Sequence, residues 1–313
     1  MPAPTDPATL ADLAVFARAE VRAGDIEPWA AVLAAWRTAG GPPSFEEAAW
    51  AVKCYNAFDD LGSAFRVVAV AVNTDQWRCA GEATRAAVAA LPCGRERRNL
   101  RGGGRMLRHL DSYVAALGGR TQAGFLFEPV PRGAGEAAGF DALMGYMRRH
   151  VWGTGRQSGF EWAEFAGKAL GVPVRAGHGC LWESSGPRQS LEAIYNAGRP
   201  ARSQYQLDQW AADCKAALGR AGAPLDWWDL ETVICDFNVM RKGRYYPGQH
   251  LAMITAEIDG CPEPWRTGLR AAYRAVIPAP WNTIAPGVDK ELAGHYARTG
   301  LIKTPFGRMA AVG

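Results

Sequence analysis

The densest group of chemically useful side chains lies between Cys93 and Arg108. Six arginines in this segment accompany one acid, Glu96, and three glycines at 102–104 come just before a predicted helix. The arginines are Arg95, Arg97, Arg98, Arg101, Arg105 and Arg108. Guanidinium groups and the free amides at a helix start are the donors that a phosphate group needs. The segment therefore predicts a phosphate site, and a solvated basic loop is the alternative interpretation.

A second segment contains the turn Gly153-Thr154-Gly155, which follows the basic residues 148–150 and precedes a predicted helix. Such a turn between two helices is typical of helix-hairpin-helix elements, whose backbone amides contact nucleic-acid phosphates; Arg156 would add charge. On the next helix Glu161 and Glu164 can point the same way and do acid or base work. A plain helix connection with surface glutamates explains the pattern about as well.

A third segment places an aromatic side chain beside a carboxylate. Trp182 and Glu183 precede a polar turn that ends at Arg188 and begins a helix. An aromatic ring beside a carboxylate in a loop can stack on and contact a base drawn out of a duplex. The alternative is a Trp packed beneath a turn.

A fourth segment, 229–248, predicts a helix with a polar face. That face carries Glu231, Cys235, Asn238 and Lys242, at spacings of four, three and four. Asp236 lies one step round, and Arg244 and Tyr245 follow the helix, so phosphate contact and base stacking are available together. We interpret Cys235 as a small core residue rather than as a nucleophile.

A fifth segment ends a predicted helix with Tyr55 and the acid pair Asp59–Asp60. Ser44 begins this helix with a capping box, and Gly62 interrupts it. Two adjacent acids at a helix end are unfavourable for the helix dipole, which hints at a role other than stability.

Composition limits the other chemistries. The chain has 313 residues, 48% of them hydrophobic, and a net charge of +4; 29 of its 35 basic residues are arginine. Seven cysteines without a CxxC pair and five histidines without zinc-enzyme spacing predict no disulfide framework, no metal and no cofactor. The absence of a P-loop motif argues against a nucleotide kinase activity.

The elements that must position these residues are helices. Apolar residues recur at helical spacing along most of the chain, and only 124–130 and 172–175 suggest strands. We predict an all-α, multi-helix protein in two lobes, 1–120 and 140–313, that act as a single catalytic unit over 1–313. No apolar run is long enough to cross a bilayer and no secretory signal is visible, so we expect a cytoplasmic protein without a membrane partner.

Together the five segments resemble the phage amino acid:DNA transferases, also called α-glutamyl/putrescinyl thymine pyrophosphorylases. The segments are Tyr55 to Ala64, Gly94 to Gly102, Gly153 to Phe160, Trp182 to Arg188, and Cys235 to Gly243. The helical domain is also similar to that of phage hydroxymethyluracil DNA kinases. The resemblance implies a fold related to helix-hairpin-helix DNA glycosylases, although the glycosylase aspartate about twenty residues past the hairpin has no evident counterpart here.

The resemblance implies a specific reaction and two partners. An amino acid or polyamine displaces phosphate or pyrophosphate from a phosphorylated 5-hydroxymethyl pyrimidine in phage DNA, inside the host cytoplasm. Candidate bases for the incoming amine are Glu161, Glu183 and Asp236. Candidate substrate and phosphate contacts are Tyr55, Asp59, Arg95, Arg97, Arg98, Arg101, Arg156, Trp182, Arg188, Lys242, Arg244 and Tyr245. A DNA glycosylase or lyase and a non-enzymatic DNA-binding protein are the alternatives.

Overall fold

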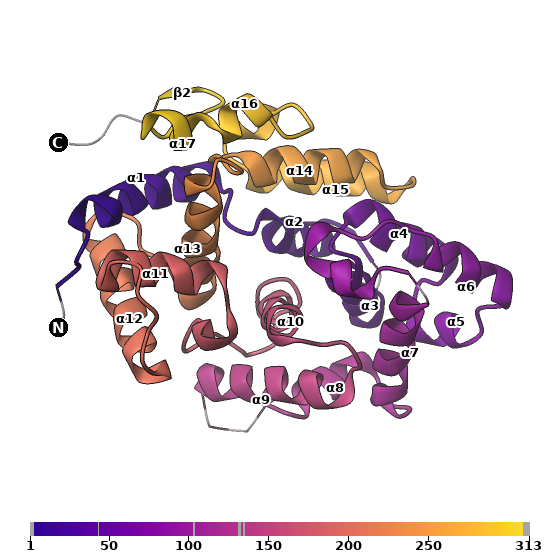
Figure 1. The fold of residues 1–313 in the computed structure, drawn as a ribbon. Helices are drawn as coiled ribbons and strands as arrows, with labels where there is room; N and C mark the ends of the chain where they lie inside the picture. Colours follow the sequence, from indigo (N-terminus) through magenta and orange to yellow (C-terminus); the bar gives the residue numbers. More distant parts are fainter. Residues whose placement is uncertain (1–2, 43, 103, 131–132, 134, 309–313) are drawn as a thin grey trace. The chain divides into compact units, whose positions relative to one another are not determined.

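The computed structural model describes residues 3–42, 44–102, 104–130, 133 and 135–308, without the side chains of Arg98 and Arg308. Over these residues the chain is almost entirely helical, which confirms the predicted all-α class (Figure 1). The sheet in this part of the chain is one hairpin of two-residue strands, β1 (Lys303–Thr304) and β2 (Gly307–Arg308). None of the described helices is long and apolar enough to cross a membrane.

The two predicted strands are wrong. Most of 124–130 lies in helix α8 (Gln122–Phe127), which Thr121 caps by accepting the N–H of Gly124 at 3.0 Å. Residues 172–175 form no strand. Short apolar runs fit a buried helix as well as a strand, so their pattern alone does not separate the two.

The chain divides into two compact units, each built from separate stretches of sequence. Unit 1 comprises Met1–Pro28, His178–Thr255 and Ile277–Gly313, and unit 2 comprises Trp29–Gly177 and Ala256–Val276. The predicted lobes and the single catalytic unit stay predictions.

The core of unit 1 is built from α1 and from the helices after residue 180. Its elements are the hairpin of β1 and β2 and the helices α1 (Pro7–Ala23), η2 (Leu181–Glu183), α11 (Gly186–Asn196), α12 (Gln204–Arg220), α13 (Trp227–Arg241), the first part of α14 (Gln249–Asp259), η3 (Trp281–Thr283), α16 (Lys290–Ala293) and α17 (His295–Thr299). Phe16, Trp210 and Phe237 are among the buried side chains, and helix α1 packs against α11, α12 and α13. The N-terminal helix therefore completes a core built mainly from the second half of the chain.

Unit 2 is organised around helix α3 (Phe45–Phe58). Its other elements are α2 (Pro28–Thr38), α4 (Leu61–Val70), α5 (Thr74–Arg78), α6 (Glu82–Ala89), η1 (Arg95–Leu100), α7 (Arg105–Leu117), α8, α9 (Gly135–His150), α10 (Arg156–Lys168), the end of α14 and α15 (Trp265–Val276). Every residue of α3 from Ala48 to Phe58 is buried, and the helix contacts α4, α7, α8 and α10. A helix that is apolar nearly all round belongs inside a protein, so the few polar side chains on α3 are placed in the core.

Candidate active site

The acid pair Asp59–Asp60 forms the junction between α3 and α4 in unit 2. Asp59 caps the C-terminus of α3 with a left-handed backbone, φ 55°. Asp60 caps the N-terminus of α4, and its carboxylate accepts the N–H of Ser63 at 2.7 Å. Free amides at a helix start stabilise a carboxylate. Asp60 therefore has a structural role, which accounts for one of the two adjacent acids.

The arginine segment folds back onto this junction. The Gly94 N–H donates to the carbonyl of Phe58 at 2.7 Å, and the Glu96 N–H donates to Oδ2 of Asp59 at 3.1 Å. A Cβ atom at position 94 would overlap both the carbonyl oxygen and the carboxylate of Asp59. Only glycine fits this close approach, and η1 starts directly after it.

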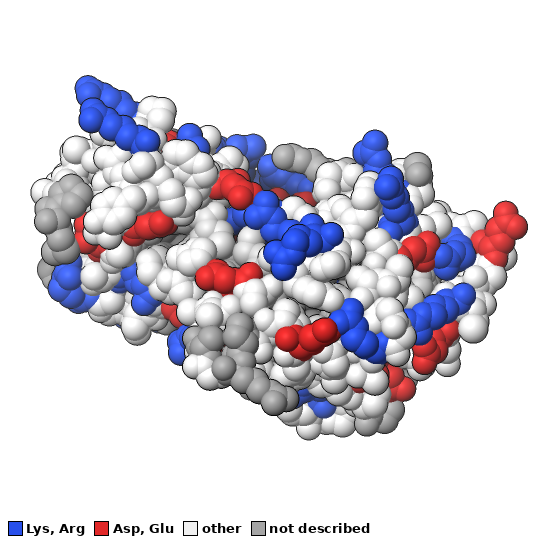
Figure 2. All heavy atoms as spheres, turned by 90° about the horizontal axis from the view of Figure 1, so that it is seen from below, with Lys and Arg blue, Asp and Glu red and all other residues white. Residues whose placement is uncertain are grey.

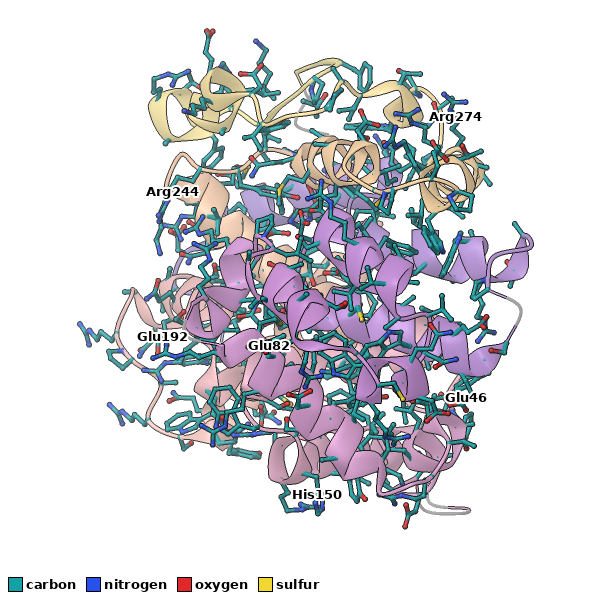
Figure 3. All side chains as sticks on the ribbon, turned by 90° about the vertical axis from the view of Figure 1, so that its right-hand side faces the viewer. Glu46, Glu82, His150, Glu192, Arg244 and Arg274 are labelled. Carbon is teal, nitrogen blue, oxygen red and sulfur yellow. The ribbon has the colours of Figure 1, made fainter. Side chains whose placement is uncertain are left out.

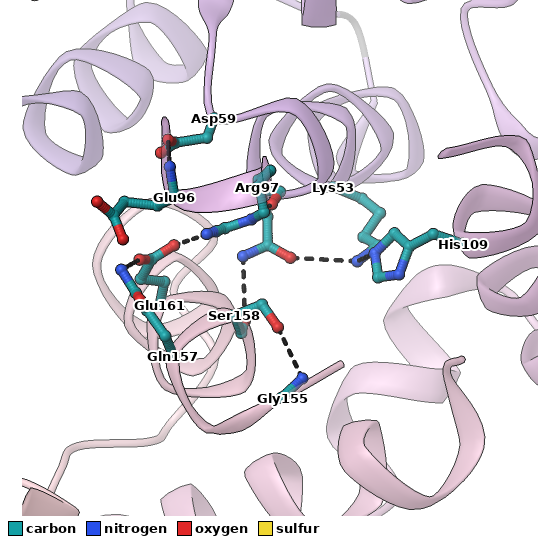
Figure 4. Close-up of polar contacts among 10 residues, drawn as sticks. Lys53, Asp59, Glu96, Arg97, His109, Gly155, Gln157, Ser158 and Glu161 are labelled. Atoms are coloured by element: carbon teal, nitrogen blue, oxygen red, sulfur yellow. Dashed lines mark hydrogen bonds and ion pairs between the residues drawn. The ribbon is translucent and has the colours of Figure 1, made fainter. Parts of the chain in front are cut away.

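Arg97 lies inside unit 2, with 2% of its surface exposed. Its Nε donates to the backbone carbonyl of Asn56 at 2.7 Å, and its Nη2 forms an ion pair with Glu161 on α10 (Figure 4). Burial lowers the pKa of this guanidinium, but the carboxylates of Glu161 and Asp59 outweigh that effect and raise it. Arg97 is therefore charged, and it joins η1 to both α3 and α10.

The carboxyl of Asp59 lies in the field of this ion pair. Burial raises its pKa from the ordinary 3.8, Arg97 lowers it and Glu161 raises it, and the resulting pKa is about 7. Asp59 is only half-buried, so it also reaches solvent. A carboxyl with this pKa is present in both protonation states at neutral pH and can accept or donate a proton.

The predicted hairpin connects α9 to α10 (Figure 1). Gly153 has φ 80°, and a Cβ there would lie 3.1 Å from Cδ2 of Leu100. The neighbouring amides are bonded within the protein: Trp152 N–H to Oγ of Ser112 at 2.9 Å, Thr154 N–H to the carbonyl of Val151 at 3.2 Å, and Gly155 N–H to Oγ of Ser158 at 3.0 Å. The first turn of α10, which starts at Arg156, adds the N–H groups that a helix start leaves without intrahelical partners.

Three polar side chains that the sequence analysis missed lie beside Arg97. Lys53 and Asn56 come from α3 and His109 comes from α7; Nζ of Lys53 is 3.1 Å from Oδ1 of Asn56 and 2.9 Å from Nε2 of His109 (Figure 4). Burial and then the nearby Arg97 lower the pKa of Lys53 from 10.5 to about 7. Burial and then Lys53 lower the pKa of His109 well below its ordinary 6.5. The available signal was one lysine and one asparagine inside an otherwise apolar run, residues 48–58.

The other predicted arginines of unit 2 lie nearer the surface. Arg95 is exposed, Arg101 is exposed and donates to the carbonyls of Cys93 and Gly94 at 3.0 and 3.1 Å, and the Arg156 guanidinium lies 4.9 Å from the centre of a phenylalanine ring. The side chain of Arg98 lies outside the described residues. On the face drawn in Figure 2, lysines and arginines stand in separate groups with acids beside several of them, so positive charge there is local.

Tyr55 packs in the core of unit 2. Its ring is stacked on Trp29 at 6.3 Å and meets Phe165 edge-on at 5.1 Å, and 4% of its surface is exposed. These contacts explain why an aromatic residue suits the position. Its predicted role beside a flipped base stays a prediction.

In unit 1 the fourth segment packs against the helix that follows the third. A Cβ at Gly186 would lie 3.0 Å from Sγ of Cys235, so α11 approaches α13 closely there. Nζ of Lys242, at the end of α13, donates to Oε1 of Gln189 at 2.8 Å, and Nδ2 of Asn238 donates to the same oxygen at 3.5 Å. Two segments about fifty residues apart therefore share one side-chain network.

The remaining surface candidates of unit 1 stand near the ends of η2 and α13. Trp182 is 39% exposed, with the guanidinium of Arg188 5.5 Å from its ring centre, and Glu183 is exposed. Arg188 also donates to a carboxylate of its own helix, Glu192, at 2.9 Å. Arg244 is exposed at the outer edge of its unit (Figure 3).

Asp236 and Tyr245 belong to a buried cluster with three side chains that the sequence analysis missed, Glu20, Asp25 and His250. The Tyr245 hydroxyl is 2.9 Å from Oδ2 of Asp25 and 3.2 Å from Oε2 of Glu20. Nδ1 of His250 is 3.8 Å from Oδ2 of Asp236. The hydroxyl of Tyr245 therefore lies within hydrogen-bond distance of the buried carboxyls of Glu20 and Asp25.

Two of these carboxyls have no exposed surface. Burial raises the pKa of Glu20 well above its ordinary value, as does the nearby Asp25, and burial also raises the pKa of Asp25. Asp25 receives the N–H of Leu251 at 2.9 Å and that of Gly248, which favour its charged form. We therefore place the proton on Glu20. No pattern in the sequence links residues 20 and 25 to this site.

The sequence model of the amino acid:DNA transferases matches residues 23–246. The chain belongs to the amino acid:DNA transferase family. The match confirms the resemblance carried by the five segments, whose matching motifs run from Tyr55 to Gly243 and lie inside the matched range, and the family description identifies the protein as a transferase. No curated protein matches the sequence.

The transferase carries its family segments in two groups. The arginine segment, the hairpin segment and the segment that ends in Asp59–Asp60 meet around Arg97 in unit 2. In unit 1, the segment on α13 packs beside α11, the helix that follows the Trp182 segment. Within the described residues no group of three His, Cys, Asp or Glu side chains could hold a metal ion.

Proposed function

We propose that this transferase joins an amino acid or another amine to a phosphorylated 5-hydroxymethyluracil base in DNA, displacing phosphate or pyrophosphate. The family supports the coarser activity, transfer of an amino acid to DNA. The modified base and the leaving group follow from the resemblance of the five segments. The C–N bond forms as the C–O bond to phosphate breaks, and the amine releases one proton.

The main support for the proposal is the Asp59 carboxyl, which lies beside Arg97 and has a pKa suited to a general base. The amino group of a free amino acid or a polyamine is protonated at neutral pH, so the incoming amine must lose a proton before it attacks. A base is most effective when its pKa lies close to the working pH, and the pKa of Asp59 is about 7. Glu161 is bound in the ion pair with Arg97, so we assign it to positioning that guanidinium.

The same segment supplies positive charge for the leaving group. Arg97 interacts electrostatically with the Asp59 carboxyl, and Arg95 and Arg101 are exposed on either side of it in sequence. Guanidinium groups stabilise the charge that develops on a departing phosphate. We assign Arg95 and Arg101 to the phosphate and Arg97 to the electrostatics of the base.

We assign the α9–α10 hairpin to the DNA backbone. Gly153, with its positive φ, allows the tight connection, and the first-turn amides of α10 with Arg156 form a site suited to an anion. This assignment agrees with the helix-hairpin-helix character that the resemblance implies. Phosphate contacts of this kind position a protein on DNA without reading its sequence.

The deciding experiment incubates the full chain with DNA that contains phosphorylated or pyrophosphorylated 5-hydroxymethyluracil and a mixture of amino acids and polyamines. Mass spectrometry of the released nucleosides should show a base heavier by the amine. Asp59→Asn should lower the transfer rate roughly 100-fold, whereas the exposed control Asp75→Asn should not change it. Loss of the base would indicate a glycosylase, and binding without any new nucleoside would indicate a DNA-binding protein; either result refutes the proposal.

A further inference from the structure

We propose that Lys53 and His109 are positioning residues that hold the DNA-contacting hairpin and Arg97 in one fixed arrangement within unit 2. The inference rests on the proposed function, because it concerns the parts assigned there to the DNA backbone and to the base. It names two residues that act through others, since 0% of Lys53 and 1% of His109 is exposed.

The hydrogen bond between His109 and the hairpin fixes the tautomer of His109. Nδ1 of His109 lies 2.7 Å from the carbonyl oxygen of Trp152, the residue before Gly153 in the hairpin. A carbonyl oxygen only accepts, so Nδ1 carries the hydrogen and donates it. In the neutral imidazole Nε2 then has a lone pair, and it accepts a hydrogen bond from Nζ of Lys53 at 2.9 Å.

Two further hydrogen bonds link Lys53 to Arg97 through Asn56. Nζ of Lys53 donates to Oδ1 of Asn56 at 3.1 Å, which turns the amide so that Nδ2 donates to the carbonyl of Ser158 at 3.1 Å (Figure 4). The backbone carbonyl of Asn56 accepts from Nε of Arg97 at 2.7 Å. Every link has a defined donor and acceptor, so the hydrogen bonds orient these side chains relative to one another.

The chemical character of Lys53 distinguishes this connection from ordinary packing. Among the described residues its Nζ contacts neutral groups, namely Asn56, His109 and the rings of Tyr113 and Trp162 at 5.2 and 5.3 Å. Burying an amine among neutral groups costs free energy that an apolar side chain of similar length would avoid. The site therefore uses the directed hydrogen bonds of the amine, which an apolar side chain cannot supply.

A matched pair of variants separates hydrogen bonding from packing. His109→Gln keeps one donor for the Trp152 carbonyl and one acceptor for Lys53, whereas His109→Leu fills the space and keeps neither. We expect His109→Leu to lower the rate of amine transfer roughly tenfold or more and His109→Gln to stay within about threefold of wild type. Both variants are compared by circular dichroism to establish that they fold. Equal activity of the two folded variants would overturn the proposal.

Two further measurements keep the test independent of the reaction. The ¹⁵N shifts of His109 should show hydrogen on Nδ1 and an acceptor at Nε2, and Lys53→Met, which retains the volume, should move the Nε2 shift and weaken binding to the modified DNA roughly tenfold. Unchanged shifts and affinity in Lys53→Met would refute the connection. If the wild type transfers no amine while the shifts and affinities behave as expected, the proposed function fails and the positioning role stands.

Discussion

Replacing the buried lysine on α3 with methionine should change how stability depends on pH. Lys53 has no exposed surface, and its pKa is about 7 rather than 10.5. Methionine has nearly the same length and no charge. Lys53→Met therefore removes one titrating group from the core while the volume is kept, so cavity effects stay small.

The expected magnitude follows from the two pKa values. They differ by about 3.5, and each pH unit corresponds to about 1.36 kcal/mol, so the protonated lysine costs the fold about 5 kcal/mol. Because the folded pKa is the lower one, this cost is fully present below about pH 7 and disappears as the pH rises toward 10.5. Methionine removes the cost but leaves the acceptors on Asn56 and His109 without a donor, at about 1–3 kcal/mol each.

At neutral pH, the cost of the charged lysine and the loss of its two hydrogen bonds nearly cancel in the comparison of wild type with Lys53→Met. At higher pH the cost of the charge falls, so the two effects no longer cancel. At pH 7 the free energies of unfolding of wild type and Lys53→Met should agree within about 2 kcal/mol. Between pH 7 and pH 9.5 the wild type should gain about 3 kcal/mol relative to the variant. Urea unfolding followed by circular dichroism measures both, and Lys215→Met, which replaces a half-buried lysine of unit 1, is the control. Parallel pH profiles for wild type and Lys53→Met would refute the reasoning.

Three other substitutions test separate parts of the structure. Gly94→Ala should lower the free energy of unfolding by about 1–3 kcal/mol, because its Cβ would overlap Asp59; thermal and urea unfolding report it. Glu161→Gln should cost about 3–5 kcal/mol by leaving the Arg97 guanidinium buried without its partner, and it should also shift the pH profile of transfer. Tyr245→Phe should cost about 1–3 kcal/mol, because the buried carboxyls of Glu20 and Asp25 lose the hydroxyl that both of them contact; urea unfolding measures it.

Each of these predictions has a matched control in the same chain. Gly81→Ala places a Cβ in open space, Asp75→Asn breaks an exposed ion pair, and Tyr205→Phe removes a hydroxyl from a residue that is 73% exposed. All three should leave the unfolding midpoint almost unchanged. If a control is as damaging as its counterpart, the contact named for that counterpart does not explain its effect.

Much of the helical layout could be predicted because its signals are local. Ser44 begins α3 as expected, its hydroxyl accepting the N–H of Glu47 at 3.2 Å, and glycines end several helices in left-handed conformations. The apolar run at 124–130 misled the prediction because a short buried helix and a short strand present the same pattern. Unit 1 takes residues from three separate stretches of the chain, and the contacts that bring such stretches together are not a property of neighbouring residues.

By itself the sequence determined the helical class, the five segments and hence the family, because periodicity, capping residues and short motifs are properties of neighbouring residues. Only the tertiary structure decided which members of those segments share an environment. It buried Arg97 against Glu161, and it joined Lys53 to His109 across 56 positions. It gave Asp59 a pKa of about 7 through burial and the charges around it. Burial and electrostatic fields depend on every element packed nearby, so no single segment of sequence contains them.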